Sequence, residues 1–532
     1  MMKKTFFCCF ILFFVVSGWA QKAYDLSSPA AVLQVPRQDK QRLLDEDEKN
    51  GKGRLRCAVL LPFQMAFPKD IVPEKVADGT VWRMKIEAED AEAINLYLSD
   101  FKLPKGVELS FYTSDFEYIL PTILPDEPPQ NGIYITDYLS GSNMIVELFA
   151  QKGVEVSHCF TIEDVGYMYR PLPRWMGGSR GFGDSKDCEV NVNCPEGDNW
   201  QDEKKGVARI ILIAAGDAWY CTGSLINNVR NDKTPYFLTA SHCADGTTEE
   251  EFKRWKFYFN YESPDCFNPQ KDPNNPDNPT TIGAERIAEG EFHPIYGSTE
   301  GSDFLLLKLD DKLASRSDLY YNGWNVAVTP ATGGVGIHHP AGDIKKISTY
   351  TKPLQQSDRE SHWDVHWVQT QTDWGVTEGG SSGSPIFDQN KYIVGTLSYG
   401  WAACATPSEE DSYGKMACHW NWKGNGATPA QQLKPWLDPD NTGITKLQGL
   451  GEKKPPVFNN PTDSVVYVKL ENGENQKLKV YDVMGRLVME KQISVVDETE
   501  IIEVNLWELP AGMYIMVING NNGRKTHKII KL

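Results

Sequence analysis

The chain has 532 residues, which is too long for one hydrophobic core, so about three domains are expected. Its formal net charge of -18 argues against a nucleic-acid partner, because phosphate binding needs a basic face that the sequence does not offer. Acidity of this kind is more typical of a soluble protein.

Residues 1–20 have the pattern of a signal peptide. Lys3 and Lys4 precede an apolar run that extends from Phe6 to Val16, and small residues end the segment at Ala20. The apolar run is too short for a comfortable membrane span, and no later segment offers a transmembrane candidate. We therefore expect an exported protein whose cysteines can form disulfides.

Residues 21–180 are predicted to be a propeptide that contains a β-sandwich. From Gln21 to about Arg54 the chain is polar, as in a leader or linker. Between about Cys57 and Asp164, apolar and polar residues alternate with the period of half-buried strands. The clearest runs are 81–86, 94–98, 107–111 and 144–149. With no catalytic constellation here, we expect a domain that assists folding or blocks a cleft; a permanent accessory domain is the alternative.

A basic, glycine-rich stretch separates this region from the next domain. It lies between Arg170 and Cys188 and includes Arg180 and Lys186. Exposed loops of this type are where proteases cut. The mature chain is expected to start near Gly181 or Gly183.

Three motifs in the next region predict a serine protease. An apolar strand ends at His242, Asp303 enters an apolar strand, and Ser382 lies in a Gly-rich loop. A general base must be held rigidly, a buried carboxylate needs a partner such as imidazole, and a serine nucleophile needs a loop that exposes it. The order His, Asp, Ser is that of the chymotrypsin-type double β-barrel.

Each of these roles has a rival. Asp310 is the nearest alternative to Asp303, and the neighbouring Ser381 and Ser384 are alternatives to Ser382. Several other histidines could act as the base, but none lies in a Thr-Ala-Ser-His-Cys run; they are His293, His338, His339 and His366. The backbone N–H groups of Gly380 and Ser382 are expected to form the oxyanion hole.

The region from about Cys188 to Gly443 resembles the lysyl endopeptidase family. The matching motifs are Cys194-Pro195-Glu196-Gly197-Asp198, Cys221-Thr222-Gly223-Ser224-Leu225, Ile337-His338-His339-Pro340, Gly380 to Pro385, Asp411-Ser412-Tyr413-Gly414 and Trp436-Leu437-Asp438-Pro439. The resemblance implies an all-β, chymotrypsin-like double-barrel protease domain over residues 181–449. It also implies a secreted serine endopeptidase that acts on protein or peptide substrates without a cofactor or a metal.

Cleavage after basic residues, with lysine favoured, is a further implication of the resemblance. It assigns Asp411 to the pocket for the basic side chain, whereas Val376 stands where trypsin has its acid. A carboxylate in a closed pocket would pair with an ammonium or guanidinium group. Glu378 is expected to help shape the pocket, and Ser398 and Gly400 to pair with the substrate backbone. A solvated loop acid is the alternative for Asp411.

Two departures from related patterns leave questions open. Ser398 stands where the resembled family usually has histidine, so strictness for lysine over arginine is in doubt. Ser381, not aspartate, precedes the nucleophile, so a new amino terminus has no acid to pair with at that position. A glutamyl endopeptidase of the same fold and a catalytically silent, protease-like binding protein remain alternatives. The first normally has a histidine at the position of Ser398, and the second would need a broken triad.

The cysteines fit an exported protein. Of the eleven, Cys8 and Cys9 belong to the signal peptide. Sequence alone cannot choose a connectivity, but the resemblance implies that Cys188 pairs with Cys404, Cys194 with Cys266, and Cys221 with Cys243. In the propeptide, Cys57 and Cys159 are expected to pair, which leaves Cys418 as a buried thiol.

After a linker over residues 450–463, residues 464–532 form another domain of short strands. Residues 477–488 have a strand-turn-strand pattern, and further strand-like runs cover residues 504–506, 509–514 and 528–531. As a set they resemble the C-terminal sorting domain of the bacterial type IX secretion system. This implies the secretion machinery as a partner and a secreted or cell-surface location in a Gram-negative bacterium. A carbohydrate-binding or adhesive sandwich is the alternative.

Overall fold

The computed structural model describes residues 31–50, 55–116, 118–125, 131–170, 183–270, 272–273, 278–290, 301–451, 457–458, 465–471, 475–494, 499–507, 509–520 and 523–531. They fall into two compact units, residues 1–450 and 451–532. The predicted signal peptide, most of the predicted cleavage stretch and most of the linker lie outside the described residues. No helix among the described residues is long and apolar enough to cross a membrane.

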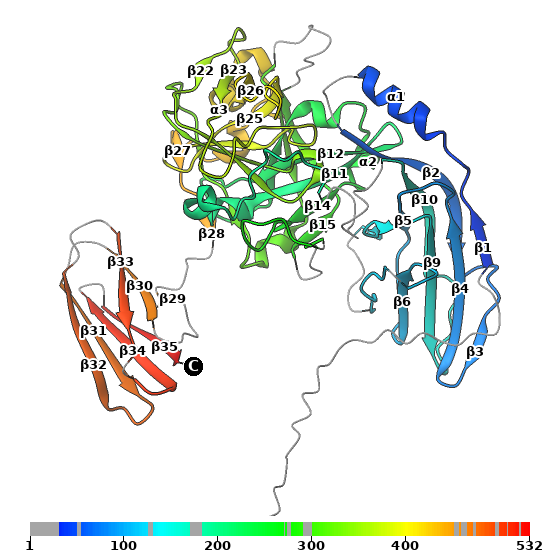
Figure 1. Cartoon of the computed structure of the whole chain (residues 1–532), viewed down its shortest axis with the longest axis horizontal. Coiled ribbons are helices and arrows are strands. Elements are labelled where there is room, and N and C mark those ends of the chain that lie inside the picture. The colour runs from blue at the N-terminus through cyan, green and yellow to red at the C-terminus, as the bar shows by residue number, and fades with distance from the viewer. Residues whose placement is uncertain are drawn as a thin grey trace, which may run out of the picture. The chain divides into compact units, whose positions relative to one another are not determined.

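The N-terminal region is a β-sandwich, as its alternating pattern predicted (Figure 1). One sheet contains β1 (Ala31–Gln34), β3 (Glu74–Val76), β4 (Gly79–Glu87), β6 (Val107–Tyr112) and β9 (Asn143–Gln151). The other contains β2 (Leu55–Phe67), β5 (Ala93–Ser99), β7 (Tyr134–Ile135), β8 (Leu139–Ser140) and β10 (Phe160–Met168). Apolar side chains such as Met84, Leu96, Val146 and Ile162 form the core between them.

The polar stretch before this sandwich is not all linker. It contains β1, which pairs in parallel with β4, and helix α1 (Lys40–Asn50). Leu43 on α1 is buried in the sandwich core, and Arg56 of β2 donates to its carbonyl oxygen at 3.0 Å. One leucine and one arginine thus fix a helix whose other residues are mostly polar, which explains why the sequence pattern did not reveal it.

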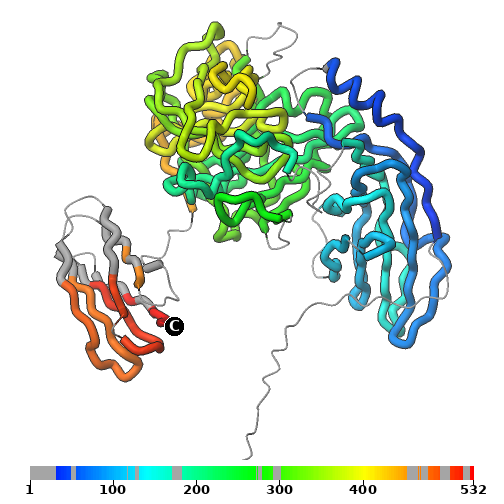
Figure 2. The backbone as a smooth tube through the Cα atoms, viewed as in Figure 1, coloured from blue at the N-terminus to red at the C-terminus, as the bar shows by residue number. Residues whose placement is uncertain are grey.

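The first barrel of the protease region shares a sheet with the sandwich. The 12-stranded sheet has the order β15-β14-β11-β12-β2-β10-β5-β7, so that β2 joins the two (Figure 2). The barrel strands are β11 (Val207–Ala214), β12 (Asp217–Leu225), β13 (Tyr236–Thr239), β14 (Lys256–Phe259), β15 (Thr280–Ile282), β16 (Glu285–Gly290) and β17 (Phe304–Lys308). Its short helices are η1 (Pro195–Trp200), η2 (Glu203–Gly206), η3 (Ser241–Ala244), α2 (Glu249–Phe252) and η4 (Asp311–Ser315).

A nine-stranded sheet forms the second half of the protease region. Its strands are β19 (Trp324–Asn325), β20 (Gly334–His338), β21 (Lys346–Tyr350), β22 (Gln355–Gln356), β23 (His362–His366), β24 (Pro385–Asp388), β25 (Ile393–Gly400), β26 (Glu410–Lys415) and β27 (Lys446–Leu447). Beside it lie the pair β18 (Tyr320–Tyr321) and β28 (Leu450–Gly451), and the helices η5 (Pro340–Gly342), α3 (Met416–Asn421), η6 (Lys423–Asn425), η7 (Pro429–Gln431) and α4 (Lys434–Leu437). One buried cluster contains Leu238 and Phe304 of the first half together with Ile337 and Phe387 of the second, so the halves pack together.

Three disulfides stabilise the protease region, and their pairing is the one that the resemblance implied. Cys188 bonds Cys404, Cys194 bonds Cys266, and Cys221 bonds Cys243. Cys418 is buried and outside these disulfides, as expected.

The expected disulfide between Cys57 and Cys159 was wrong. Cys57 lies on β2, and the N–H of Cys159 donates to the carbonyl of Phe67 at the far end of the same strand. Ten residues of strand span roughly 30 Å, which no disulfide can bridge.

The C-terminal unit is a second, smaller β-sandwich. One sheet contains β29 (Val457–Phe458), β30 (Val465–Glu471) and β33 (Thr499–Asn505). The other contains β31 (Asn475–Asp482), β32 (Leu487–Ser494), β34 (Gly512–Gly520) and β35 (Gly523–Lys531). The expected turn between β31 and β32 has Gly485 at a φ of 78°, a conformation that glycine adopts easily. All parts that the structure describes are thus built mainly of strands, which confirms the all-β class.

Candidate active site

His242 and Asp303 form the buried centre of the candidate site. His242 lies in the short helix η3 directly after β13, and Asp303 directly precedes β17, which pairs with β13. The Nδ1 atom of His242 is 2.8 Å from Oδ2 of Asp303, and the backbone N–H of His242 donates to Oδ1 at 3.0 Å. Two adjacent strand ends therefore hold the imidazole against the carboxylate.

These contacts make the carboxyl group of Asp303 a stronger acid than an ordinary aspartic acid. Burial alone favours its neutral form, but the charge of His242 and hydrogen bonds from His242 and Ser398 outweigh burial and lower the pKa of Asp303. The Ser398 hydroxyl donates to Oδ2 at 2.5 Å. Asp303 also has a φ of 61°, an unusual backbone conformation that persists where the surroundings impose it. Its rival Asp310 instead caps the exposed helix η4.

A second buried histidine supports Asp303 from behind. His419 of α3 contacts the Ser302 hydroxyl at 2.8 Å and the Thr396 hydroxyl at 3.0 Å. Thr396 in turn donates to the carbonyl oxygen of Asp303 at 3.3 Å. Burial lowers the pKa of His419 to about 3, so this ring is neutral and acts as a hydrogen-bonding brace.

The loop of Ser382 packs against the strands that lead to His242. The N–H of Thr222 on β12 donates to the carbonyl oxygen of Ser382 at 2.8 Å. A Cβ atom at Gly383 would lie 2.1 Å from the Thr239 hydroxyl, so only glycine lets the loop come this close. Ser382 itself is half-buried, and its hydroxyl makes no hydrogen bond to His242 within the described part of the chain. Such bonds often tighten only when substrate binds.

In this loop, every second backbone N–H group has no hydrogen-bond acceptor among the described residues. Ser381 donates its N–H to the carbonyl of Glu378 at 3.0 Å, and Gly383 donates to the carbonyl of Leu397 at 2.9 Å. The N–H groups of Gly380 and Ser382 donate to no acceptor among the residues that the structure describes. Gly380 has a φ of 96°, which orients its peptide in a way that a residue with a side chain rarely allows. The two N–H groups are therefore available to an oxyanion.

His338 holds the residue before Ser382. Its Nδ1 atom is 2.8 Å from the Ser381 hydroxyl, and its Nε2 atom is 2.8 Å from the Ser348 hydroxyl. Burial lowers the pKa of His338 to about 3, so it stays neutral at physiological pH. These contacts let His338 brace the nucleophile loop and argue against it as the base.

Asp411 lies inside the second barrel, among hydrogen-bond donors. It is fully buried on β26, and its Oδ2 atom accepts hydrogen bonds from the Trp367 indole at 2.7 Å and the Thr377 hydroxyl at 2.8 Å. The N–H of Ala402 donates to Oδ1 at 3.2 Å. The alternative of a solvated loop acid is therefore wrong.

Gly400 leaves the room that Asp411 needs. It pairs with Asp411 across β25 and β26, and a Cβ atom there would lie 1.7 Å from Oδ1 of Asp411. On the other edge of β25, strand β24 pairs only as far as Thr396. Residues 398–400 therefore form a strand edge next to Ser382 that no other described strand covers.

Glu378 lies on the other side of the nucleophile loop. Its carboxylate accepts the N–H of Lys186 at 2.9 Å, and burial raises its pKa. It belongs to a group of acids near the start of the protease region, while its neighbour Thr377 contacts Asp411. A role of Glu378 in the specificity pocket remains a prediction.

Comparisons with known proteins match two regions of the chain to family models. Residues 182–414 match the family model of the lysyl endopeptidase C-terminal domain. Residues 456–532 match that of the secretion system C-terminal sorting domain. The protease region is lysyl endopeptidase-like. The second match indicates export by a secretion system, to the medium or the cell surface.

One curated relative is the lysyl endopeptidase of Pseudomonas aeruginosa. It is 28% identical over 294 residues, which cover 53% of this chain and 60% of the relative. The chain thus matches somewhat over half the length of that relative.

Similar solved structures include serine proteases from several sources. The thermostable protease AL20 is 12% identical, with a TM-score of 0.28 over 40% of this chain and 92% of its own. Mouse neuropsin is 14% identical, with a TM-score of 0.29 over 42% and 94%. A Glu endopeptidase is 18% identical, with a TM-score of 0.25 over 44% and 92%.

Proposed function

We propose that the protein is a secreted serine endopeptidase that hydrolyses peptide bonds after basic residues, with lysine favoured. The observation that carries this proposal is the pairing of His242 with Asp303 beside a loop that exposes Ser382 and two free N–H groups. The family match of residues 182–414 supports it. Buried Asp411 supplies the preference for a cation.

In the proposed mechanism, Ser382 attacks the scissile carbonyl while His242 takes its proton. Asp303, which contacts Nδ1, holds the imidazole in the tautomer whose Nε2 accepts that proton and stabilises the imidazolium. The N–H groups of Gly380 and Ser382 bind the oxyanion. His242 then protonates the leaving amine, and water hydrolyses the acyl-enzyme by the same steps in reverse order.

Substrate binding follows from two features of the second barrel. An extended peptide would pair with residues 398–400, where the edge of β25 is open. Its basic side chain would then enter the pocket that ends at Asp411. Trp367 and Thr377 use Oδ2 as an acceptor, so they favour the ionised carboxylate that an ammonium group needs.

A glutamyl endopeptidase is the second candidate, and the pocket argues against it. A glutamate side chain would bring a second carboxylate toward buried Asp411, and like charges repel strongly at low dielectric. Ser398, at the position where such enzymes have histidine, donates its hydroxyl to Asp303 and offers no positive charge.

A digest of an unstructured protein tests the proposal. We expect the new C-termini, identified by mass spectrometry, to be lysine with a minority of arginine. Cleavage after glutamate would favour the second candidate, and no cleavage by a pure, correctly processed sample would favour a silent binding protein.

We further propose that residues 21–180 are a propeptide that helps the first barrel to fold and covers the edge beside the site. Support comes from the pairing of β2 with residues 217–220 of β12. This pairing stops two residues before Thr222, whose N–H contacts Ser382. No described hydrogen bond joins the domain to His242, Asp303 or Ser382, so it would cover the edge beside the site and leave the triad itself untouched.

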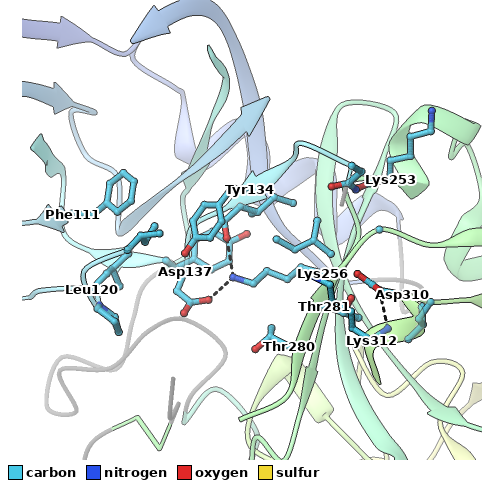
Figure 3. A pocket seen from close by; sticks show the side chains of 18 of the residues that line it. Phe111, Leu120, Tyr134, Asp137, Lys253, Lys256, Thr280, Thr281, Asp310 and Lys312 are labelled. Atoms are coloured by element: carbon cyan, nitrogen blue, oxygen red, sulfur yellow. Dashed lines mark hydrogen bonds and ion pairs between the residues drawn. The ribbon is translucent and has the colours of Figure 1, made fainter. Parts of the chain in front are cut away.

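Charged contacts fasten this domain to the barrel. Lys256 of β14 extends to Asp137 at 2.7 Å and to the carbonyl of Ile135 at 2.9 Å (Figure 3). Asp217 of β12 accepts from Arg56 at 3.1 Å. Apolar packing joins the two as well, since Tyr138 of this domain and Tyr220 of the barrel belong to one buried cluster. Removal of the propeptide would therefore expose apolar as well as charged barrel residues.

Export by the type IX system and removal of both ends are part of the same proposal. We expect the mature protein to begin near Gly181 or Gly183 and to end before residue 464. Intact-mass measurement of the protein from culture medium and cell surface checks both cuts. A fully active species that extends from Gln21 to Leu532 would refute them.

A further inference from the structure

The segment that begins at Gly183 is bonded to two acids next to the candidate site. The N–H of Gly183 donates to Oδ1 of Asp343 at 2.7 Å, and the Ser185 hydroxyl donates to Oδ2 of the same residue. The N–H of Lys186 donates to Glu378 at 2.9 Å. Asp343 is buried, and Glu378 belongs to the nucleophile loop. The start of the protease region is thus tied to the loop that carries Ser382.

A third acid in this cluster lies against Glu378. Glu189 is 9% exposed, and neither of its carboxyl oxygens has a hydrogen-bond partner among the described residues. Burial, and then the neighbouring Glu378, raises the pKa of Glu189 well above its usual value. The nearby buried cation is Lys346, whose Nζ is 3.8 Å from Asp343 and donates to Asn191 at 2.8 Å. Two buried acids, Asp343 and Glu189, and the half-buried Glu378 therefore share one buried ammonium group.

The position of Asp343 matters for the oxyanion hole. Asp343 closes the turn η5, because its N–H donates to the carbonyl of Pro340 at 2.8 Å. Within that turn, the N–H of Ala341 donates to the carbonyl of Gly379 at 2.7 Å. A Cβ atom at Gly380 would lie 3.0 Å from the nitrogen of Gly342, so turn and loop are in direct contact. A shift of Asp343 would therefore displace the peptide that presents the Gly380 N–H.

We propose that Asp343, Glu189 and Glu378 form a binding site for the α-ammonium group of a chain that begins at Gly183. Hydrolysis breaks the preceding C–N bond, adds the hydroxyl of water to the carbonyl carbon and adds its proton to the nitrogen. At neutral pH the new carboxyl group then loses a proton and the new amine gains one. A neutral N–H donor at 2.7 Å from Asp343 becomes a cation with three N–H donors. The new charge offsets the excess of carboxylates and locks η5 against residues 379 and 380.

This inference rests on the proposed protease function and chooses between the two predicted starts. A chain that began at Gly181 would carry its ammonium group two residues before the nitrogen that contacts Asp343. Ser381 cannot accept the charge, since it has no carboxylate and its hydroxyl contacts His338. Asp343 is thus a positioning residue that acts on catalysis through η5.

The site has a defined pH signature. The titratable and charged groups around Asp343 include the acids Glu189 and Glu378. The others are Lys186, Arg209, Tyr261, His339 and Lys346. An α-amino group has an ordinary pKa of about 8, and carboxylates around it raise that value. The activity that depends on the ammonium group is therefore complete below pH 8 and is lost as the pH rises through the raised pKa.

The test compares two forms of the full chain. In one, a specific processing site replaces residues 179–182, so that the cut falls directly before Gly183. In the other, two extra residues lie between the cut and Gly183. Both release the same N-terminal region. We expect the first form to have a kcat on a lysyl ester at least tenfold higher and to react faster with a fluorophosphonate at Ser382. Equal kcat and equal labelling in both forms would overturn the inference, whereas no labelling in either would count against the protease function itself.

Asp343→Asn supplies the second arm, since an amide keeps the acceptor for the Gly183 N–H without the charge. In the form cut before Gly183, Asp343→Asn should remove most of the gain in kcat and move the alkaline limb of the pH–kcat profile to lower pH. In the extended form, Asp343→Asn should change neither kcat nor the pH profile. Asp187→Asn, an exposed acid in the same segment, is the matched control and should leave both profiles unchanged. An alkaline limb that does not move in Asp343→Asn would contradict the proposal, and thermal unfolding checks that each variant is folded.

Discussion

Replacement of Ser382 by alanine is expected to abolish peptide hydrolysis and to leave the fold intact. The members of a Ser-His-Asp triad act as a unit, so loss of the nucleophile costs on the order of 10⁴–10⁶ in kcat. The Ser382 hydroxyl makes no described hydrogen bond to His242, and its carbonyl oxygen keeps the bond from Thr222. We therefore expect an unchanged unfolding temperature. Steady-state rates on a lysyl peptide and a thermal melt measure the two quantities.

A matched control shows whether a loss of activity comes from the missing nucleophile or from the preparation of the variant. Ser408→Ala removes a hydroxyl from an exposed loop of the same barrel and should keep full activity. Peptidase activity retained by Ser382→Ala after rigorous purification would refute the assignment of the nucleophile. Ser381 and Ser384 would then be the residues to replace next.

The candidate triad could be proposed from sequence because each member lies in a short local motif. His242 follows an apolar strand, Asp303 precedes one, and Ser382 lies among glycines, so local residue types mark the sites. The fold class was accessible for the same reason, since alternation with a period of two is a local signal.

The supporting contacts could not be predicted, because they join residues far apart in the chain. His338 contacts Ser381, 43 residues away, and Trp367 contacts Asp411, 44 residues away. The Ile337-His338-His339-Pro340 motif marked His338 as notable but did not give its role. No comparable signal marked Trp367.

Errors in the N-terminal region have a similar origin. The expected Cys57 to Cys159 disulfide assumed that two cysteines in one small domain lie close together. Cys57 is instead near the start of β2, and Cys159 lies beside Phe67 at the end of β2. Helix α1 escaped notice because its burial depends on Leu43 and on contacts with Arg56. In both cases tertiary packing determines the structure, and the local sequence pattern does not encode that packing.

The proposed role of Asp411 makes a strong prediction about specificity. Asp411→Asn should lower kcat/KM on lysyl peptides by about 10²–10⁴, because loss of one partner of a buried ion pair costs about 3–5 kcal/mol. Asparagine is nearly isosteric, and its amide oxygen can still accept from Trp367 or Thr377. Folding should therefore survive. Small esters that place no cation in the pocket should be hydrolysed at a nearly normal rate, since the triad and Gly380 are untouched.

The contrast between substrates is what identifies Asp411 as a specificity residue. A variant that only loosened the second barrel would lose activity on both kinds of substrate, whereas a lost counter-ion affects the lysyl peptide alone. Glu409→Gln removes a neighbouring charge that is exposed, so it controls for the net charge of the loop and should behave as wild type. If Asp411→Asn cleaves lysyl peptides as well as wild type does, the basic side chain binds elsewhere. If Asp411→Asn lost lysyl-peptide and ester turnover equally, Asp411 would serve the packing of the barrel. Only an acid in the specificity pocket can distinguish a substrate with a charged side chain from one without.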